Sequence, residues 1–247
     1  MIKVRYKITF SYDGSKFNGY QKQKSIDNTV QGIIENALKY INNEKDTKLC
    51  SSGRTDKGVS AYKQVAHTDI DVKITPYKLK CALNSLTPDT IHIYEVEKVD
   101  DSFHARYMVK EKTYIYKINT KEYNPIEKDY VCQLCKELDI DLLKKEIKDF
   151  IGTHDFSSFS SNEDKKEDCV RTIFKASVKK EGNYVIFSFT GNGFLKYMVR
   201  IMSGYLISVS LGKQEKGKIP YYLKNTQKKV TTKTAIATGL YLYDIKY

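Results

Sequence analysis

The sequence has 247 residues, which favours one large domain or two domains of modest size. Its 42 Lys and Arg residues outnumber its 30 Asp and Glu residues, so the formal net charge is +12 at pH 7. A positive surplus of this size favours a polyanionic partner, either a nucleic acid or an anionic membrane surface. No stretch approaches the ~20 apolar residues of a transmembrane helix, which argues against an integral membrane protein.

The cysteines and the first residues indicate the compartment. The five cysteines are an odd number, and the opening residues MIKVRYKITF have neither the apolar core nor the cleavage site of a secretory signal. We therefore expect a cytoplasmic protein with reduced thiols and no disulfide framework. Cys132 and Cys135 form a single CxxC pair without a second one, and the four histidines show no ligand spacing, so the sequence predicts no metal site.

The first predicted element is a strand over residues 4–12, where apolar and polar residues alternate. Apolar residues at helical spacing then predict a helix over residues 30–41. The elements expected after it are a short strand at 47–50, a strand at 61–70, a helix at 76–86 and a strand at 90–99. This β-α-β-β-α-β order is typical of an antiparallel sheet with helices on one face.

The second half of the chain shows a similar mixture. The expected elements are strands at 114–118, 171–178, 184–190 and 240–245, and helices at 142–151 and 195–211. The charged run at 162–168 predicts a solvated loop. The sequence therefore predicts an α+β fold of two halves, residues 1–106 and 107–247. Each half is expected to have a mainly antiparallel sheet with flanking helices.

The segment SSGRTDKGVSA, residues 51–61, carries the strongest chemical signal. Gly53 and Gly58 enclose Arg54 and Asp56 in a loop at the end of a predicted strand, where folds often expose reactive groups. Asp56 would be held rigid there, with Arg54 placed to bind phosphate or to keep the carboxylate ionised. The same pattern also suits an ordinary Asp-capped turn, and the pattern alone leaves both interpretations open.

This loop resembles the catalytic loop GRTDxGVHA of the tRNA pseudouridine synthase A family. Seven further segments, spread over nearly the whole chain, resemble motifs of that family in the same order. They are YDGSKFNGYQKQ (12–23), LNSLTPDTI (83–91), FHARY (103–107), KTYIYKI (112–118), GTHDFSSF (152–159), GNGFLKYMVRIMSG (191–204) and TAIATGLYL (234–242). An ordered series of this kind is far more specific than any one of its members.

The chain departs from the family pattern at a few positions. Tyr20 stands where the family usually has Trp, Ser60 where it usually has His, and Ile236–Ala237 replaces a pair that contains Pro. None of these changes removes Asp56, so the chemistry that the resemblance implies is retained. They leave open a paralogue with a shifted range of substrates.

The resemblance implies that Asp56 is the catalytic aspartate for the isomerisation of uridine to pseudouridine, without cofactor or metal. Its carboxylate suits both addition to C6 of the uracil and attack or deprotonation at the sugar near C1′. The resemblance further implies that Arg54 occupies the space left by the flipped base, and that Arg106 lines the RNA cleft.

Two residues of the second half complete the implied site. Tyr114 matches the tyrosine that packs against the target uracil, although its strand pattern equally suits a core aromatic. Arg200, with Lys196, is one of two charges in the apolar predicted helix, and the resemblance pairs it with Asp56. A helix-edge Arg that reaches solvent is the alternative.

For the whole protein the resemblance implies a homodimer acting on tRNA at uridines 38, 39 and 40 of the anticodon stem-loop. It also implies that the two α+β halves meet at a central basic cleft that holds Asp56. Two alternatives stay open: a divergent paralogue that modifies other tRNA uridines, and a non-catalytic tRNA-binding protein. Asp56, present together with Arg54, Tyr114 and Arg200, favours the enzyme.

Overall fold

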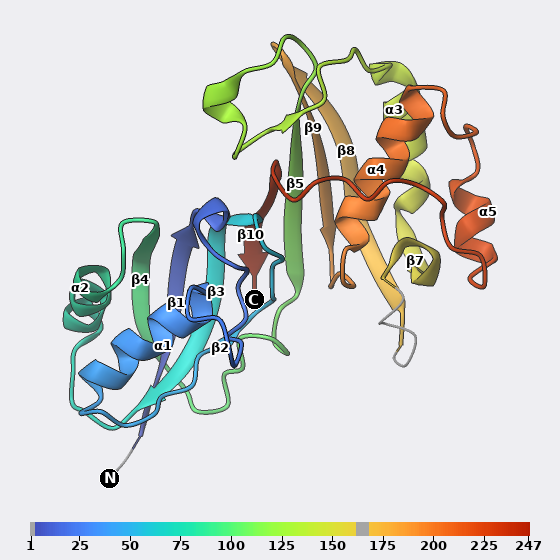
Figure 1. Ribbon diagram of the computed structural model, residues 1–247. Helices are drawn as coiled ribbons and strands as arrows, with labels where there is room; N and C mark the ends of the chain where they lie inside the picture. The colour runs from blue at the N-terminus through green and yellow to red at the C-terminus, as the bar shows by residue number, and fades with distance from the viewer. Residues whose placement is uncertain (1–2, 162–167) are drawn as a thin grey trace. The chain divides into compact units, whose positions relative to one another are not determined.

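The computed structural model describes residues 3–161 and 168–247 (Figure 1). The chain forms two compact units. Unit 1 comprises Met1–Lys110 together with Tyr241–Tyr247, and unit 2 comprises Glu111–Leu240. Most of the loop expected at 162–168 lies outside the described residues.

Unit 1 is a mainly antiparallel sheet with two helices, as the sequence predicts. Its strands are ordered β4-β1-β3-β10, β2 pairs with β3, and only β10 runs parallel to β3. In Figure 1, α1 lies in front of this sheet, and α2 contacts both α1 and β4. The elements are β1 (Val4–Tyr12), α1 (Val30–Ile41), β2 (Cys50–Ser51), β3 (Ser60–Ile70), α2 (Pro76–Leu86), β4 (Ile91–Val99) and β10 (Leu240–Lys246).

The patterns seen in the sequence explain the core of unit 1. Tyr6, Ile8 and Phe10 alternate along β1 and are all fully buried, because one face of an alternating strand packs on the core. In α1, Ile34 and Leu38 are one helical turn apart and are fully buried too. The unit therefore has a core in which β1 and α1 each contribute one apolar face.

Unit 2 has the same two kinds of element in a different order. Its strands form the antiparallel order β5-β9-β8-β7, with β6 parallel to β5. Helices α3 and α4 contact each other, and α3 also contacts β8. The elements are β5 (Glu111–Asn119), β6 (Cys132–Gln133), α3 (Ile140–Glu146), β7 (Gly152–Asp155), β8 (Val170–Glu181), β9 (Tyr184–Gly191), α4 (Met198–Ser210) and α5 (Ile219–Lys224).

The structure corrects one expectation about the helices of unit 2 and adds one helix. The helix expected from residue 195 begins at Met198, because Tyr197 adopts a left-handed backbone conformation with φ of +61°. Lys196 therefore precedes the helix and does not share a helical face with Arg200. The Lys-rich stretch at 213–233, for which no helix was expected, contains the short helix α5 with Pro220 in its first turn.

The division into units also differs from the expected one, which placed all of residues 107–247 in the second half. Strand β10 pairs with β3, with Tyr241 opposite Ser60. Lys63 Nζ lies 2.7 Å from Asp244 Oδ1, and the Tyr247 hydroxyl donates to Ala105 O at 2.7 Å. These long-range bonds hold the last seven residues in unit 1. Unit 1 therefore consists of two separate segments of the chain, which a single boundary in the sequence cannot describe.

Candidate active site

The loop that carries Asp56 joins β2 to β3 and is fixed to β3 where it begins. The Ser52 backbone N–H donates to Val65 O at 2.8 Å, and its hydroxyl donates to Gln64 Oε1 at 2.6 Å. The Gln64 amide in turn donates to Gly53 O at 3.1 Å. Ser52 and Gln64 are both fully buried, so the bond between their side chains forms away from competing water, and together these bonds fix the loop backbone.

The middle of the loop is held by β1 and by the segment that follows it. The Tyr12 hydroxyl and Thr55 Oγ1 lie 2.8 Å apart in a buried hydrogen bond, and Tyr20 N donates to Thr55 O at 3.1 Å. Burial raises the pKa of Tyr12 above its ordinary value, so its hydroxyl is a neutral hydrogen-bonding group. Asp56 therefore follows a residue held from two sides.

Two glycines complete the support. A Cβ on Gly14 would lie 2.0 Å from Val59 O, so only glycine fits beside the end of the loop. Gly58 has a φ of +83°, the left-handed conformation that the turn after Asp56 requires, and Val59 N donates to Asp56 O at 3.1 Å. The glycine-containing segment 12–20 and the Asp56 loop thus form one packed structure, although 36 residues separate Tyr20 from Asp56 in the numbering.

The loop presents its charged side chains to the outside. Asp56 is half-buried, whereas Arg54 and Lys57 are exposed. A carboxylate on a fixed backbone, beside cations that can contact phosphate, can approach a polyanionic substrate without first ordering the loop. This arrangement favours a functional carboxylate over a simple capped turn.

The departures from the family pattern in unit 1 are accommodated locally. Ser60 Oγ accepts a hydrogen bond from Gly14 N at 2.9 Å, so the serine helps to hold segment 12–20 against the loop. Tyr20 is 1% exposed, and its ring centroid lies 6.0 Å from that of Tyr12. Ser60 and Tyr20 therefore both pack beside the loop, and neither substitution displaces Asp56.

The remaining residues expected in the site fall in both units. Arg106 is half-buried in the turn that follows β4 in unit 1. Tyr114 lies on β5 of unit 2, is 8% exposed and packs edge-on against Phe194 at 5.1 Å between ring centroids. Arg54, Asp56 and Arg106 thus belong to unit 1, and Tyr114 and Arg200 to unit 2.

Arg200 has a defined environment on α4. Its Nε donates to Ala235 O at 2.8 Å, and its guanidinium carbon lies 4.9 Å from the ring centroid of Tyr197. Lys196 Nζ lies 5.4 Å from the same ring, so the two charges flank one exposed aromatic ring. Arg200 is half-buried and hydrogen-bonded, which differs from a helix-edge Arg that extends into solvent.

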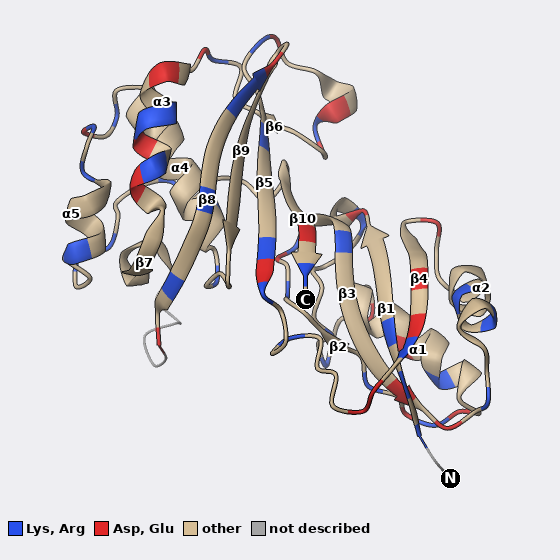
Figure 2. Ribbon diagram, turned by 180° about the vertical axis from the view of Figure 1, so that it is seen from behind, with Lys and Arg blue, Asp and Glu red and all other residues tan. Residues whose placement is uncertain are grey.

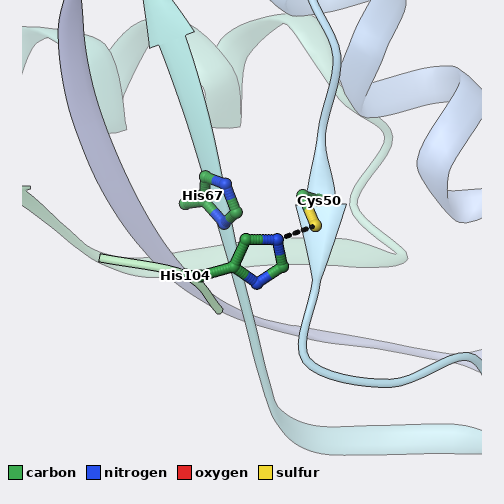
Figure 3. A group of neighbouring side chains, drawn as sticks. All are labelled: Cys50, His67 and His104. Carbon is green, nitrogen blue, oxygen red and sulfur yellow. Dashed lines mark hydrogen bonds between the residues drawn. The ribbon is translucent and has the colours of Figure 1, made fainter. Parts of the chain in front are cut away.

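Sequence reasoning missed one group of reactive side chains, which Figure 3 shows. Cys50, His67 and His104 each place one potential ligand atom within 4.8 Å of the others, the one such group found among residues 3–161 and 168–247. Cys50 and His67 are register partners on β2 and β3, and His104 joins them from a turn 37 residues beyond His67. Strand pairing was the missing signal, because no local spacing links residues so far apart.

No helix in the described part of the chain is long and apolar enough to cross a membrane.

Comparison with known proteins identifies the family. The family model described as "tRNA pseudouridine synthase" matches residues 8–108 and 147–247. The chain is 40% identical to tRNA pseudouridine synthase A 2 of Bacillus cereus, over 98% of this chain and 99% of that one. It is 41% identical to tRNA pseudouridine synthase A of Streptococcus agalactiae, over 99% of this chain and 95% of that one. A solved Cbf5-Nop10-Gar1 complex is 12% identical with a TM-score of 0.35, too low a likeness to support a conclusion. The chain therefore belongs to the tRNA pseudouridine synthase family and is an isomerase.

Proposed function

We propose that this enzyme isomerises uridine to pseudouridine in tRNA, at positions 38, 39 and 40 of the anticodon stem-loop, with Asp56 as the catalytic carboxylate. One observation carries the assignment of Asp56. Its half-buried carboxylate follows Thr55 on a loop fixed by buried hydrogen bonds, within the segment GRTDKGVSA. The family membership and the relatives' names supply the reaction and the kind of RNA.

The reaction needs a group that acts on the base or the sugar while the base is detached. The N1–C1′ glycosidic bond breaks, the uracil turns, and a C5–C1′ bond forms. C5 then loses its proton, and N1 ends with one, so no oxidant or reductant is consumed. A positioned carboxylate can carry out either of the two possible first steps, addition to C6 of the uracil or action at the sugar near C1′.

Other side chains have supporting roles in this proposal. Arg54, exposed on the same loop as Asp56, fills the space of the base that leaves the stack. Tyr114 packs against the uracil, Arg106 contacts the RNA, and Arg200 supports the charge of Asp56. The roles of Tyr114 and Arg200 require both units to serve one reaction.

The charge of the protein suits the proposed substrate. The net charge is +12, and Figure 2 shows Lys and Arg on strands and helices of both units. Contacts between these cations and RNA phosphates would position an RNA without reading its sequence. The choice of uridine therefore has to come from the active site itself. We further propose that the enzyme works in the cytoplasm as a homodimer with a basic cleft for the RNA.

Substitution of Asp56 by Asn tests the assignment. The amide keeps the shape of the side chain but removes the charge, so pseudouridine formation should fall at least ~10³-fold, more than acid–base assistance alone often supplies. Affinity for tRNA should stay within a few-fold, because binding is spread over many phosphate contacts. Tritium release from C5-labelled uridine and filter binding measure the two effects on one anticodon stem-loop.

Asp89→Asn is the matched control, because Asp89 is an exposed carboxylate in the turn between α2 and β4. Turnover in Asp56→Asn equal to that of this control would contradict the catalytic assignment. A wild-type protein that binds tRNA and releases no tritium from any tRNA would favour the non-catalytic alternative. Mapping pseudouridine in tRNA from cells with and without the gene separates positions 38, 39 and 40 from the sites of a paralogue.

A further inference from the structure

The Cys50, His67 and His104 group has a spacing that could suit a metal ion, since a sulfur and two ring nitrogens lie within 4.8 Å (Figure 3). Its hydrogen bonds indicate a different role. His67 Nδ1 accepts from the backbone N–H of Ala105 at 3.1 Å. His104 Nδ1 accepts from the backbone N–H groups of Arg106 and Tyr107 at 3.2 and 3.3 Å.

These backbone donors determine where the ring protons lie. A backbone N–H can only donate, so each Nδ1 keeps its lone pair, and the neutral ring carries its proton on Nε2. A histidine that binds a metal through Nε2 usually donates a hydrogen bond from Nδ1 instead. Metal binding would therefore place an N–H against each of these backbone N–H groups, which makes the rings unsuitable as ligands in this conformation.

The same bonds tie the turn that contains Arg106 to the sheet. Ala105 is fully buried, its N–H donates to His67 on β3, and its carbonyl accepts from the Tyr247 hydroxyl at 2.7 Å. His104 Nε2 faces Cys50 Sγ on β2 at 3.7 Å. Burial first, and then the charge of Arg5, lower the pKa of His67 to about 4, so the ring is neutral and keeps its acceptor.

We infer that His67 is a positioning residue, which holds the turn 104–107 on β3 through Ala105 and thereby fixes Arg106 for contact with the RNA. This inference rests on the proposed function of Arg106 in binding tRNA. His67 itself is 7% exposed and acts through the backbone. The acceptor at Nδ1, and not the ring as such, is the feature that the turn requires.

Two substitutions of His67 separate the acceptor from the packing. His67→Leu fills the space but removes the acceptor, whereas His67→Asn places a carbonyl oxygen close to the position of Nδ1. We expect His67→Leu to raise amide hydrogen exchange at residues 105–107 about tenfold and His67→Asn to restore protection. His92→Leu is the control, since His92 is an exposed histidine on β4 of the same unit. Equal exchange in wild type and His67→Leu would overturn the inference.

The functional consequence should appear in KM and not in kcat. Loss of positioning at a binding residue weakens ground-state and transition-state binding alike, so His67→Leu should raise KM for an anticodon stem-loop about tenfold with kcat within twofold. In an Arg106→Ala background the same change should raise KM less than twofold, because the residue it positions is gone. Additive effects of the two substitutions would assign His67 a general structural role and overturn the inference.

Further outcomes keep this test separate from that of the reaction. A wild-type protein without pseudouridine formation overturns the proposed function. The comparison of His67→Leu, Arg106→Ala and the double variant is then made by tRNA affinity in filter binding and by amide exchange at residues 105–107. Equimolar Zn²⁺ that binds to wild type and not to Cys50→Ser would overturn the assigned ring protonation. The exposed Cys81 provides the control variant, Cys81→Ser.

Discussion

The two units present their proposed functional residues in different ways. Unit 1 carries Asp56 on a loop, which is held by a hydrogen bond from Gln64 to Gly53 O and by a buried hydrogen bond between the Tyr12 and Thr55 hydroxyls. Unit 2 carries Tyr114 on a strand and Arg200 on a helix, where regular backbone bonding already fixes them. A loop needs dedicated supports and leaves a recognisable motif, whereas a functional residue on a regular element looks like its structural neighbours.

Removal of Arg200 tests whether unit 2 serves the chemistry of Asp56 at all. If the guanidinium supports that carboxylate, Arg200→Met leaves the charge of the half-buried Asp56 without this cation. We expect turnover of bound stem-loop to fall by at least ~10²-fold in single-turnover assays. Lys196→Met removes the other cation beside Tyr197 and should leave that rate near wild type. Equal rates in Arg200→Met and wild type would separate α4 from the chemistry.

Gly14→Ala tests the supports of the loop in unit 1. The added Cβ would lie 2.0 Å from Val59 O, and backbone must move to relieve the overlap. Overpacking of this kind costs ~1–3 kcal/mol, and we expect the upper end because the obstacle is backbone. At Gly193 of unit 2 a Cβ would meet only the Arg171 side chain at 3.5 Å, so Gly193→Ala should change the unfolding free energy little. Chemical denaturation of both variants measures the difference, and equal stabilities would contradict the close approach.

Gln64→Leu tests the hydrogen bonds of the same loop without a steric change. It leaves the buried Ser52 hydroxyl and the part-buried Gly53 O without Gln64, which should cost about 2 kcal/mol of unfolding free energy. We also expect turnover to fall about tenfold, because Asp56 is less well fixed. Gln214, an amide of unit 2 that donates to Thr231 O in an exposed bond, supplies the control Gln214→Leu. Wild-type stability and wild-type turnover in Gln64→Leu would show that the loop keeps its conformation without the Gln64 hydrogen bonds.

Much of this fold could be predicted from periodicity alone. The alternation in β1 and the spacing in α1 identified both elements with their observed bounds. Each element buries one face, and the apolar residues of that face recur with the period of the strand or the helix. The helix start at Met198 and the place of residues 241–247 were not predictable in this way. The first depends on one backbone angle at Tyr197, and the second on a parallel pairing with a strand about 180 residues earlier.

The residues of the candidate site likewise differ in how well the sequence predicts them. The Gly, Arg and Asp of the loop also suited an ordinary capped turn, and the resemblance of the whole segment to the family's catalytic loop pointed to function. Tyr114 kept two interpretations, since a strand aromatic that is 8% exposed looks like core whether or not it meets a substrate. The contact of His67 with Ala105 was invisible, because side-chain acceptors for distant backbone groups leave no pattern in the sequence.

The smallest effect that we predict concerns His67 and pH. Burial and Arg5, with a further contribution from His104, lower its pKa from the ordinary 6.5 to about 4, while Asp69 opposes the shift. The unfolded chain therefore binds a proton between pH 6.5 and 4 that the folded chain does not, so stability falls as pH falls through that window. Between pH 8 and pH 6 this single group should lower the unfolding free energy by about 1 kcal/mol. His67→Asn keeps the acceptor for Ala105 and cannot titrate, so its denaturation curves should lose this part of the pH dependence. The same slope in wild type and His67→Asn would mean that another group titrates in this range and that His67 keeps an ordinary pKa.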